Sequence, residues 1–160
     1  MPSPPAHAWI TTEADFDALS WHDAPLHGAC LTPGDGEVVF DLDWTAEWLE
    51  PEEGARFYRS WTAPATLVFR GVTHIQGQMK WPYDNTLLAI ARDEPPEESH
   101  DLPQQKWWIV KGVVGHLSLA AEGFTQYLRR APMLVTGGRL SPAQRGGLSF
   151  HRGPDRVVVG

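Results

Sequence analysis

The feature that most constrains the fold is an alternation of apolar and polar residues over residues 37–48, EVVFDLDWTAEW. One face of this stretch carries the apolar side chains Val38, Phe40, Leu42, Trp44, Ala46 and Trp48. Successive side chains of a β-strand point to opposite faces of a sheet, so a period of two is typical of a strand with one face on a core. We therefore expect a long, half-buried antiparallel strand here.

Further stretches with strand character follow, and they are separated by residues that favour turns, such as Pro33-Gly34-Asp35-Gly36, Pro64, Pro82 and Gly112. The expected strands cover residues 26–32, 56–61, 65–72, 74–81, 86–92, 106–112 and 115–123. This spacing predicts a mainly β fold: a single-domain antiparallel sheet that closes into a barrel or folds into a sandwich. The expected organisation is a flexible N-terminus over 1–12, one β-rich domain over 13–152 and a flexible tail over 153–160.

We expect one to three short helices. Thr12 can cap the first, with Asp15 in its first turn. A second is predicted over 123–130, GFTQYLRR, and a single turn over Ser141–Gln144, where Ser and Gln form a capping box. Residues 93–104, DEPPEESHDLPQ, are acidic and proline-rich, which predicts a mobile loop.

Charge is distributed unevenly along the chain, whose net charge is −7. Residues 1–55 contain twelve Asp and Glu residues and no Lys or Arg. The last stretch is rich in arginine, with Arg129, Arg130, Arg139, Arg145, Arg152 and Arg156. An acidic region repels nucleic acid and membrane surfaces and attracts a basic protein partner. The alternative is that the acidic strands and the arginine-rich stretch neutralise each other within the fold.

The expected location is the cytoplasm. A lone Cys30 leaves no intrachain disulfide, the N-terminus shows no secretory signal, and no apolar run approaches the roughly 18 residues that span a bilayer. We expect no cofactor, and the sequence leaves the oligomeric state open.

Asp41 and Asp43 share the polar face of the 37–48 strand with Glu47. Carboxylates two positions apart on a strand lie roughly 7 Å from each other, which is tolerable in water and costly in a core. The face must be solvated, or neutralised by a cation, a basic partner or an arginine of the C-terminal stretch. We expect a solvated face.

The position of His27 depends on the loop between the strands at 26–32 and 37–48. A three-residue loop, Gly34-Asp35-Gly36, places His27 opposite Asp43. A loop of two or four residues turns His27 toward the face of Leu42 instead. The match of apolar faces favours the three-residue loop.

Two alternative functions follow from these residues. A cluster of His22, Asp23, His27, Asp41 and Asp43 would suit a metal-dependent hydrolase, although the chain has no G-x-S-x-G motif, phosphate-binding glycine loop or Cys-based zinc spacing. The eight tryptophans suggest a carbohydrate or small-molecule binder. Trp107 and Trp108 are adjacent and must point to opposite sides of their strand, so one of them faces away from its core side.

The motifs W-H-D-x-x-x-H-G at 21–28 and A-P-A-T-L-V-F at 63–69 resemble those of a family of uncharacterised bacterial proteins of about this size. More distantly, the order of motifs is similar to immunity proteins of bacterial polymorphic toxin systems, which are small, acidic, β-rich and bind a toxin. This resemblance implies an immunity or inhibitor role but transfers no residue roles. We favour an acidic protein-binding module over an enzyme and assign no catalytic or metal-binding residue. The candidate binding residues are His22, Asp23, His27, Asp41, Asp43, Glu47, Trp107 and Trp108.

Overall fold

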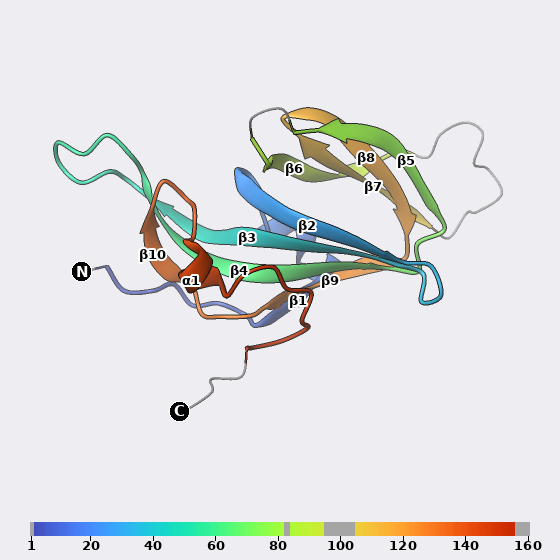
Figure 1. Cartoon of the computed structure of the whole chain (residues 1–160), viewed down its shortest axis with the longest axis horizontal. Coiled ribbons are helices and arrows are strands. Elements are labelled where there is room, and N and C mark those ends of the chain that lie inside the picture. The colour runs from blue at the N-terminus through green and yellow to red at the C-terminus, as the bar shows by residue number, and fades with distance from the viewer. Residues whose placement is uncertain (1, 82–83, 95–104, 156–160) are drawn as a thin grey trace.

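The computed structural model describes residues 2–81, 84–94 and 105–155 (Figure 1). Ten antiparallel strands form one sheet in this part of the chain. They are β1 Ile10–Thr12, β2 Ala24–Thr32, β3 Glu37–Leu49, β4 Arg59–Arg70, β5 His74–Lys80, β6 Thr86–Asp93, β7 Lys106–Gly112, β8 Val114–Ala121, β9 Gly123–Leu128 and β10 Met133–Thr136. A 3-10 helix, η1, covers Glu13–Ala18, and a single-turn helix, α1, covers Pro142–Arg145. Neither of these two described helices has the length and apolar character needed to cross a membrane.

The strand order is β1-β9-β4-β3-β2-β6-β7-β8-β5, with β10 also beside β4. β2 belongs to both halves of this sheet: Ala24 and Pro25 pair with β6, and the residues from Leu26 onward pair with β3. Because β2 and β6 share only this short contact, the sheet folds over at β2 and its two halves face each other (Figure 1). The mainly β, antiparallel prediction is confirmed. The barrel alternative is wrong, since the end strands β1 and β5 do not pair with each other among the described residues.

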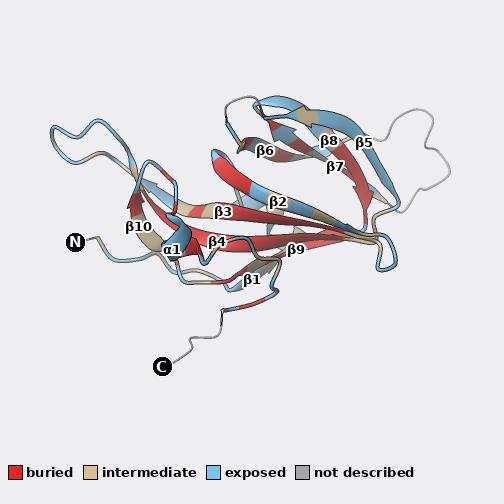
Figure 2. Ribbon diagram, in the orientation of Figure 1, coloured by how far each residue is buried: buried red, intermediate tan, exposed pale blue. Residues whose placement is uncertain are grey.

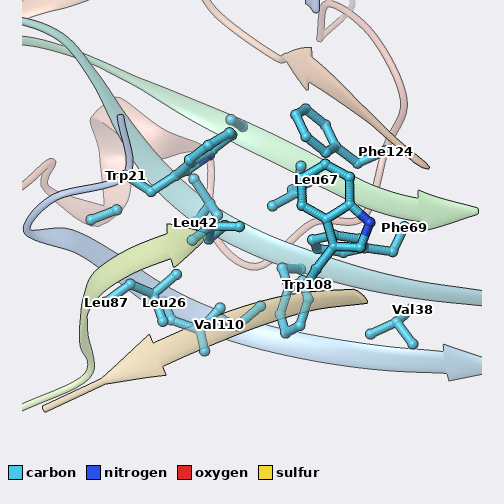
Figure 3. Packing of buried hydrophobic residues seen from close by; sticks show 14 of the residues in the cluster. Trp21, Leu26, Val38, Leu42, Leu67, Phe69, Leu87, Trp108, Val110 and Phe124 are labelled. Atoms are coloured by element: carbon cyan, nitrogen blue, oxygen red, sulfur yellow. The ribbon is translucent and has the colours of Figure 1, made fainter. Parts of the chain in front are cut away.

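The hydrophobic core lies between the two halves of the sheet. Figure 3 shows Trp21 and Trp108 packed with side chains from β3, β4 and β9. The ring of Phe124 meets both tryptophans edge to face, with centroids 5.5 Å from Trp21 and 5.4 Å from Trp108. Burial of each such side chain stabilises the fold by about 1.5–3 kcal/mol.

β3 differs from the expected half-buried strand because both of its faces are covered. Every residue from Val38 to Asp43 is buried, and β3 and β4 form the buried centre of the sheet in Figure 2. The inner face packs on the core. The outer face lies under the segment that follows α1, which crosses β3 and β4 in Figure 1.

β4 is one strand where the sequence predicted two, separated at Pro64. β3 pairs with β4 along its whole length, whereas the other side of β4 pairs with β10 at 59–62 and with β9 at 65–70. Pro64 lies in the gap between these two partners, where its missing N–H leaves no ladder hydrogen bond broken. A proline, which normally ends a central strand, is therefore accommodated within β4. Strand β10 was not predicted.

The helix predicted over 123–130 is wrong, because residues 123–128 form strand β9. Phe124, Gln126 and Leu128 alternate into the interior, and the Gln126 side chain accepts a hydrogen bond from Trp21 Nε1 at 2.8 Å. This polar residue at a core position hides the period of two.

The other two predicted helices are present, with Thr12 as the N-cap of the first and the predicted capping box at Ser141 in the second. Thr12 and Asp15 also form a capping box, which was not predicted. Most of the predicted mobile loop, residues 95–104, and the end of the predicted tail, 156–160, lie outside the described residues.

Candidate functional site

The acidic pair of β3 lies in a buried network of ion pairs. The side chains of Asp41 and Asp43 are 0% and 1% exposed. Arg129 and Arg145 donate to Asp41 Oδ1 over 2.8 Å and 2.6 Å, and Arg145 Nε also donates to Asp43 Oδ1 over 3.2 Å. The expectation of a solvated face is wrong, and arginines of the C-terminal stretch neutralise the pair. A buried carboxylate is tolerated only with this kind of pairing.

The C-terminal segment closes this network from outside. The backbone N–H of Ser149 donates to Asp41 Oδ2 over 3.0 Å, and the Thr66 hydroxyl donates to the carbonyl of His151 over 2.7 Å. A Cβ atom at Gly28 would lie only 2.6 Å from the Leu148 side chain, so the segment packs directly on β2. Asp41 and its partners therefore anchor the C-terminal segment to the sheet.

His27 reaches the acidic pair by a route that the sequence did not indicate. Thr32 pairs with Glu37, so the loop has four residues and the predicted three-residue loop is wrong. A β-bulge then shifts the register, since Leu26 pairs with Leu42 but Gly28 pairs with Asp41. The extra residue is His27, whose Nε2 lies 2.9 Å from Asp43 Oδ2.

The hydrolase alternative required these residues to gather around a metal ion. No three His, Cys, Asp or Glu side chains in the described part of the chain are arranged to hold one. The Oδ1 atoms of Asp41 and Asp43 face Arg145 instead. Glu47 lies exposed beyond a bulge of β3, between Thr45 and Glu47.

His22 and Asp23 lie in a tight turn at the start of β2. Trp21 is buried and hydrogen-bonded to Gln126, and the N–H of Ala24 donates to the carbonyl of Trp21 over 3.1 Å, which closes the turn. Asp23 has a φ of +57° and is the one residue other than glycine with a positive φ among the described residues. The buried tryptophan thus fixes the corner and directs the next two side chains to the surface.

A surface hollow, which we call the Asp23 hollow, lies beside this turn. Its smaller lobe has a volume of about 250 Å³ and is lined by His22, Asp23, Trp48 and Tyr58. An adjoining larger lobe of about 370 Å³ shares three of these residues and is also lined by Arg56, Phe57, Asp84, Thr86, Gly137 and Arg139. The aromatic residues come from the end of β3 and from the connection to β4, which projects from one end of the molecule (Figure 1).

The charges around the hollow are partly paired. Arg139 donates to Asp84 over 2.8 Å. Hydrogen bonds from Thr86, aided by the charge of Arg139, hold the pKa of the Asp84 carboxyl below its ordinary value. The guanidinium of Arg56 lies over the ring of Phe57 at 5.7 Å. The Asp23 carboxylate has a weaker partner, His22, with Nε2 at 3.3 Å.

Two of the eight candidate residues, His22 and Asp23, therefore line this hollow. Trp107 and Trp108 are both buried and offer no exposed ring to a ligand. The period of two placed Trp48 on the core side of its strand, and Tyr58 was not among the predicted binding residues. The signal that favours Tyr58 is the aromatic pair Phe57-Tyr58 two residues after the polar turn 50–54, EPEEG, because a hairpin tip has no core to bury such residues.

Comparison of the chain with protein-family models, curated proteins and solved structures finds no match. The resemblance to immunity proteins accordingly stays a prediction, and the functional argument rests on the geometry described above.

Proposed function

We propose that this chain is a protein-binding module, and that it contacts its partner through the hairpin surface, defined as Trp48, Phe57 and Tyr58 with the rim carboxylates Glu47, Glu50 and Glu53. The observation that carries this proposal is the exposure of the three aromatic side chains, at 40%, 57% and 53%. Exposed apolar groups that gather in one place are typical of interaction sites, and Trp and Tyr dominate the binding energy of many interfaces.

The charges of the hairpin surface favour a basic partner. Five of the twelve acidic residues in 1–55 pair with arginines in the fold; they are Glu13, Glu37, Asp41, Asp43 and Glu52. Among the described residues, the exposed Glu47, Glu50 and Glu53 have no Lys or Arg at ion-pair distance. Charge of this kind speeds association with a basic surface and selects against acidic partners. The five paired carboxylates are thus neutralised within the fold, whereas the three exposed carboxylates are free of such pairing in the described part of the chain and can attract a basic partner.

An immunity or inhibitor role is compatible with this surface. Residues 52–58 are all exposed and form the tip of a hairpin whose strands are held in the sheet by β3–β4 pairing up to Leu49 and Arg59. A projection on a stable scaffold can cover a basic cleft of a partner with little reorganisation. The hydrolase alternative lacks a set of metal ligands among the described residues. A carbohydrate binder would use the same aromatic faces as a protein-binding module, so the experiment must separate carbohydrate binding from protein binding.

The test is a selection of random 12-residue peptides, displayed on phage, against the purified protein. We expect the selected peptides to contain Arg or Lys beside apolar residues. We expect the double variant W48A/Y58A not to bind these peptides. Trp81→Ala is the matched control, because Trp81 is also exposed but lies on another surface. Enrichment of peptides that bind W48A/Y58A as tightly as the wild type would overturn the proposal, and so would selective binding of glycans with no peptide enriched.

A further inference from the structure

We infer that the smaller lobe of the Asp23 hollow holds one cationic side chain of the partner, a guanidinium or an ammonium group. This inference rests on the proposed function and specifies the chemistry that the hairpin surface recognises. The lobe is lined by two aromatic side chains, Trp48 and Tyr58, by one carboxylate, Asp23, and by the imidazole of His22.

The combination of aromatic rings and a carboxylate selects for a positive charge. A cation over the face of Trp or Tyr is attracted by the ring quadrupole, and a carboxylate adds an ion pair and hydrogen bonds. A carboxylate ligand would instead meet Asp23 at short range, and no Lys or Arg among the described residues lines the smaller lobe to balance it. A neutral ligand would gain neither the cation–ring attraction nor the ion pair.

The two arginines that line the larger lobe contact other residues than Asp23. Arg139 donates to Asp84, Asn85 and Thr86. Arg56 stacks on the ring of Phe57. Among the described residues, Asp23 has no Lys or Arg at ion-pair distance, and its side chain remains 49% exposed. An incoming cation therefore meets a half-exposed Asp23 carboxylate whose ion-pair partner among the described residues is the side chain of His22, with Nε2 at 3.3 Å.

The backbone supports this assignment. Asp23 adopts a positive φ at the third position of its turn, where glycine or asparagine is usual. In this conformation Asp23 lines the lobe together with Trp48 and Tyr58. Glycine would adopt this φ at a lower conformational energy but has no charged side chain. The aspartate at this position therefore provides a carboxylate at a conformational cost.

The test is an NMR titration of the full chain with small probes, following the indole N–H resonance of Trp48. The probes are Nα-acetyl-arginine amide and Nα-acetyl-lysine amide, with Nα-acetyl-glutamate amide and N-acetylglucosamine as the anionic and neutral comparisons. We expect saturable shifts with the two cations only, with a dissociation constant on the order of 10 mM, because a single cation–π contact and an exposed ion pair are weak.

The decisive variant is Asp23→Asn, which removes the charge and keeps a residue that tolerates positive φ. We expect it to weaken cation binding by about threefold to tenfold, and Trp81→Ala to leave binding unchanged. No saturable shift up to 100 mM of either cation, equal binding by Asp23→Asn, or preference for the sugar or the glutamate probe would overturn the inference. If selected peptides bind through Trp48 and Tyr58 but need no Arg or Lys, this inference fails while the proposed function stands.

Discussion

At the scale of single residues, burial decides what each charged side chain does. Asp41 is an acceptor for three donors and has no contact with solvent, so its charge serves the fold. Asp23 has the same chemistry but lies half exposed at a turn beside two aromatic rings. The difference between an anchor and a candidate binding group is therefore set by position in the sheet, since both residues are aspartates of the same acidic region.

Asp41→Asn is expected to destabilise the protein by about 3 kcal/mol, because it leaves Arg129 charged in a site with no solvent exposure. Urea unfolding followed by tryptophan fluorescence measures the loss. Glu47→Gln is the matched control on the same strand, and it should change the free energy of unfolding by less than about 0.5 kcal/mol, since Glu47 is exposed. Equal stability of the two variants would contradict a structural role for the network.

Replacement of Asp23 separates strain from charge. Asp23→Gly should be more stable than Asp23→Ala by about 1 kcal/mol, because only glycine adopts a φ of +57° without a steric penalty. Thermal unfolding of the two variants gives this difference directly. Asp23→Ala equal to or more stable than Asp23→Gly would mean that the turn relaxes and that no strain is stored there.

The sequence identified the candidate residues unevenly, for a physical reason. His22 and Asp23 stand out locally, because they follow a tryptophan and precede Ala24-Pro25 at the start of a strand. Trp48 lies on the apolar side of an alternating strand, and it is exposed because the end of β3 extends past the core. The length by which a hairpin extends beyond its neighbouring strands is set by tertiary structure, and an alternation of apolar and polar residues does not predict it.

At the scale of elements, the bulge in β2 links the sheet to the C-terminal segment. It allows His27 to contact Asp43 and places Gly28 under Leu148. The segment that contains Leu148 is in turn tied to β3 through Ser149 and to β4 through Thr66. A local irregularity of one residue thus supports the packing of a segment more than a hundred residues away.

Gly28→Val is expected to destabilise the protein by about 1–3 kcal/mol, because its side chain would collide with Leu148 and displace the C-terminal segment. Limited trypsin digestion should cut faster after Arg152 in the variant. Ala29→Val, at an exposed neighbouring position, provides the control and should behave as the wild type. Unchanged digestion of Gly28→Val would show that the segment does not depend on this contact.

The pair formed by Glu37 and Arg152 adds a pH-dependent contribution. The hydrogen bond from Arg152 holds the pKa of Glu37 below its ordinary value of 4.5, although burial opposes this. A lowered pKa in the folded state means that the stabilisation is complete above pH 4.5 and is lost as the pH falls through the lowered value.

Glu37→Gln should therefore cost no more than about 1 kcal/mol at pH 7, because Arg152 is partly exposed. The difference from the wild type should shrink in urea unfolding at pH 3. A difference that grows as the pH falls would reverse the sign and contradict the pairing.

Element prediction succeeded where the signal was local. Both short helices were predicted, the first from its N-cap and acidic first turn and the second from its capping box, because these signals involve neighbouring residues only. The prediction failed at β9, where Gln126 occupies a core position by bonding Trp21, and at β4, where Pro64 depends on which strands lie alongside. These failures share one cause, since each requires knowledge of a partner strand that is distant in the sequence.

At the scale of the whole molecule, the uneven charge has two consequences. Arginines from the second half of the chain neutralise the acidic residues that lie in or against the sheet, which ties the last segment to the strands near the beginning. The carboxylates at the hairpin tip remain exposed beside aromatic residues. The fold thus places carboxylates unpaired among the described residues and exposed aromatic side chains together on the hairpin, whose tip is exposed in Figure 2.

The most direct test of partner binding through the hairpin surface is chemical-shift mapping of the protein with a selected peptide bound. We expect the largest backbone shifts in residues 22–23, 47–58 and 137–139, which form the hollow and its rim. Shifts that instead cluster on β5 and β8, with residues 47–58 unperturbed, would contradict it.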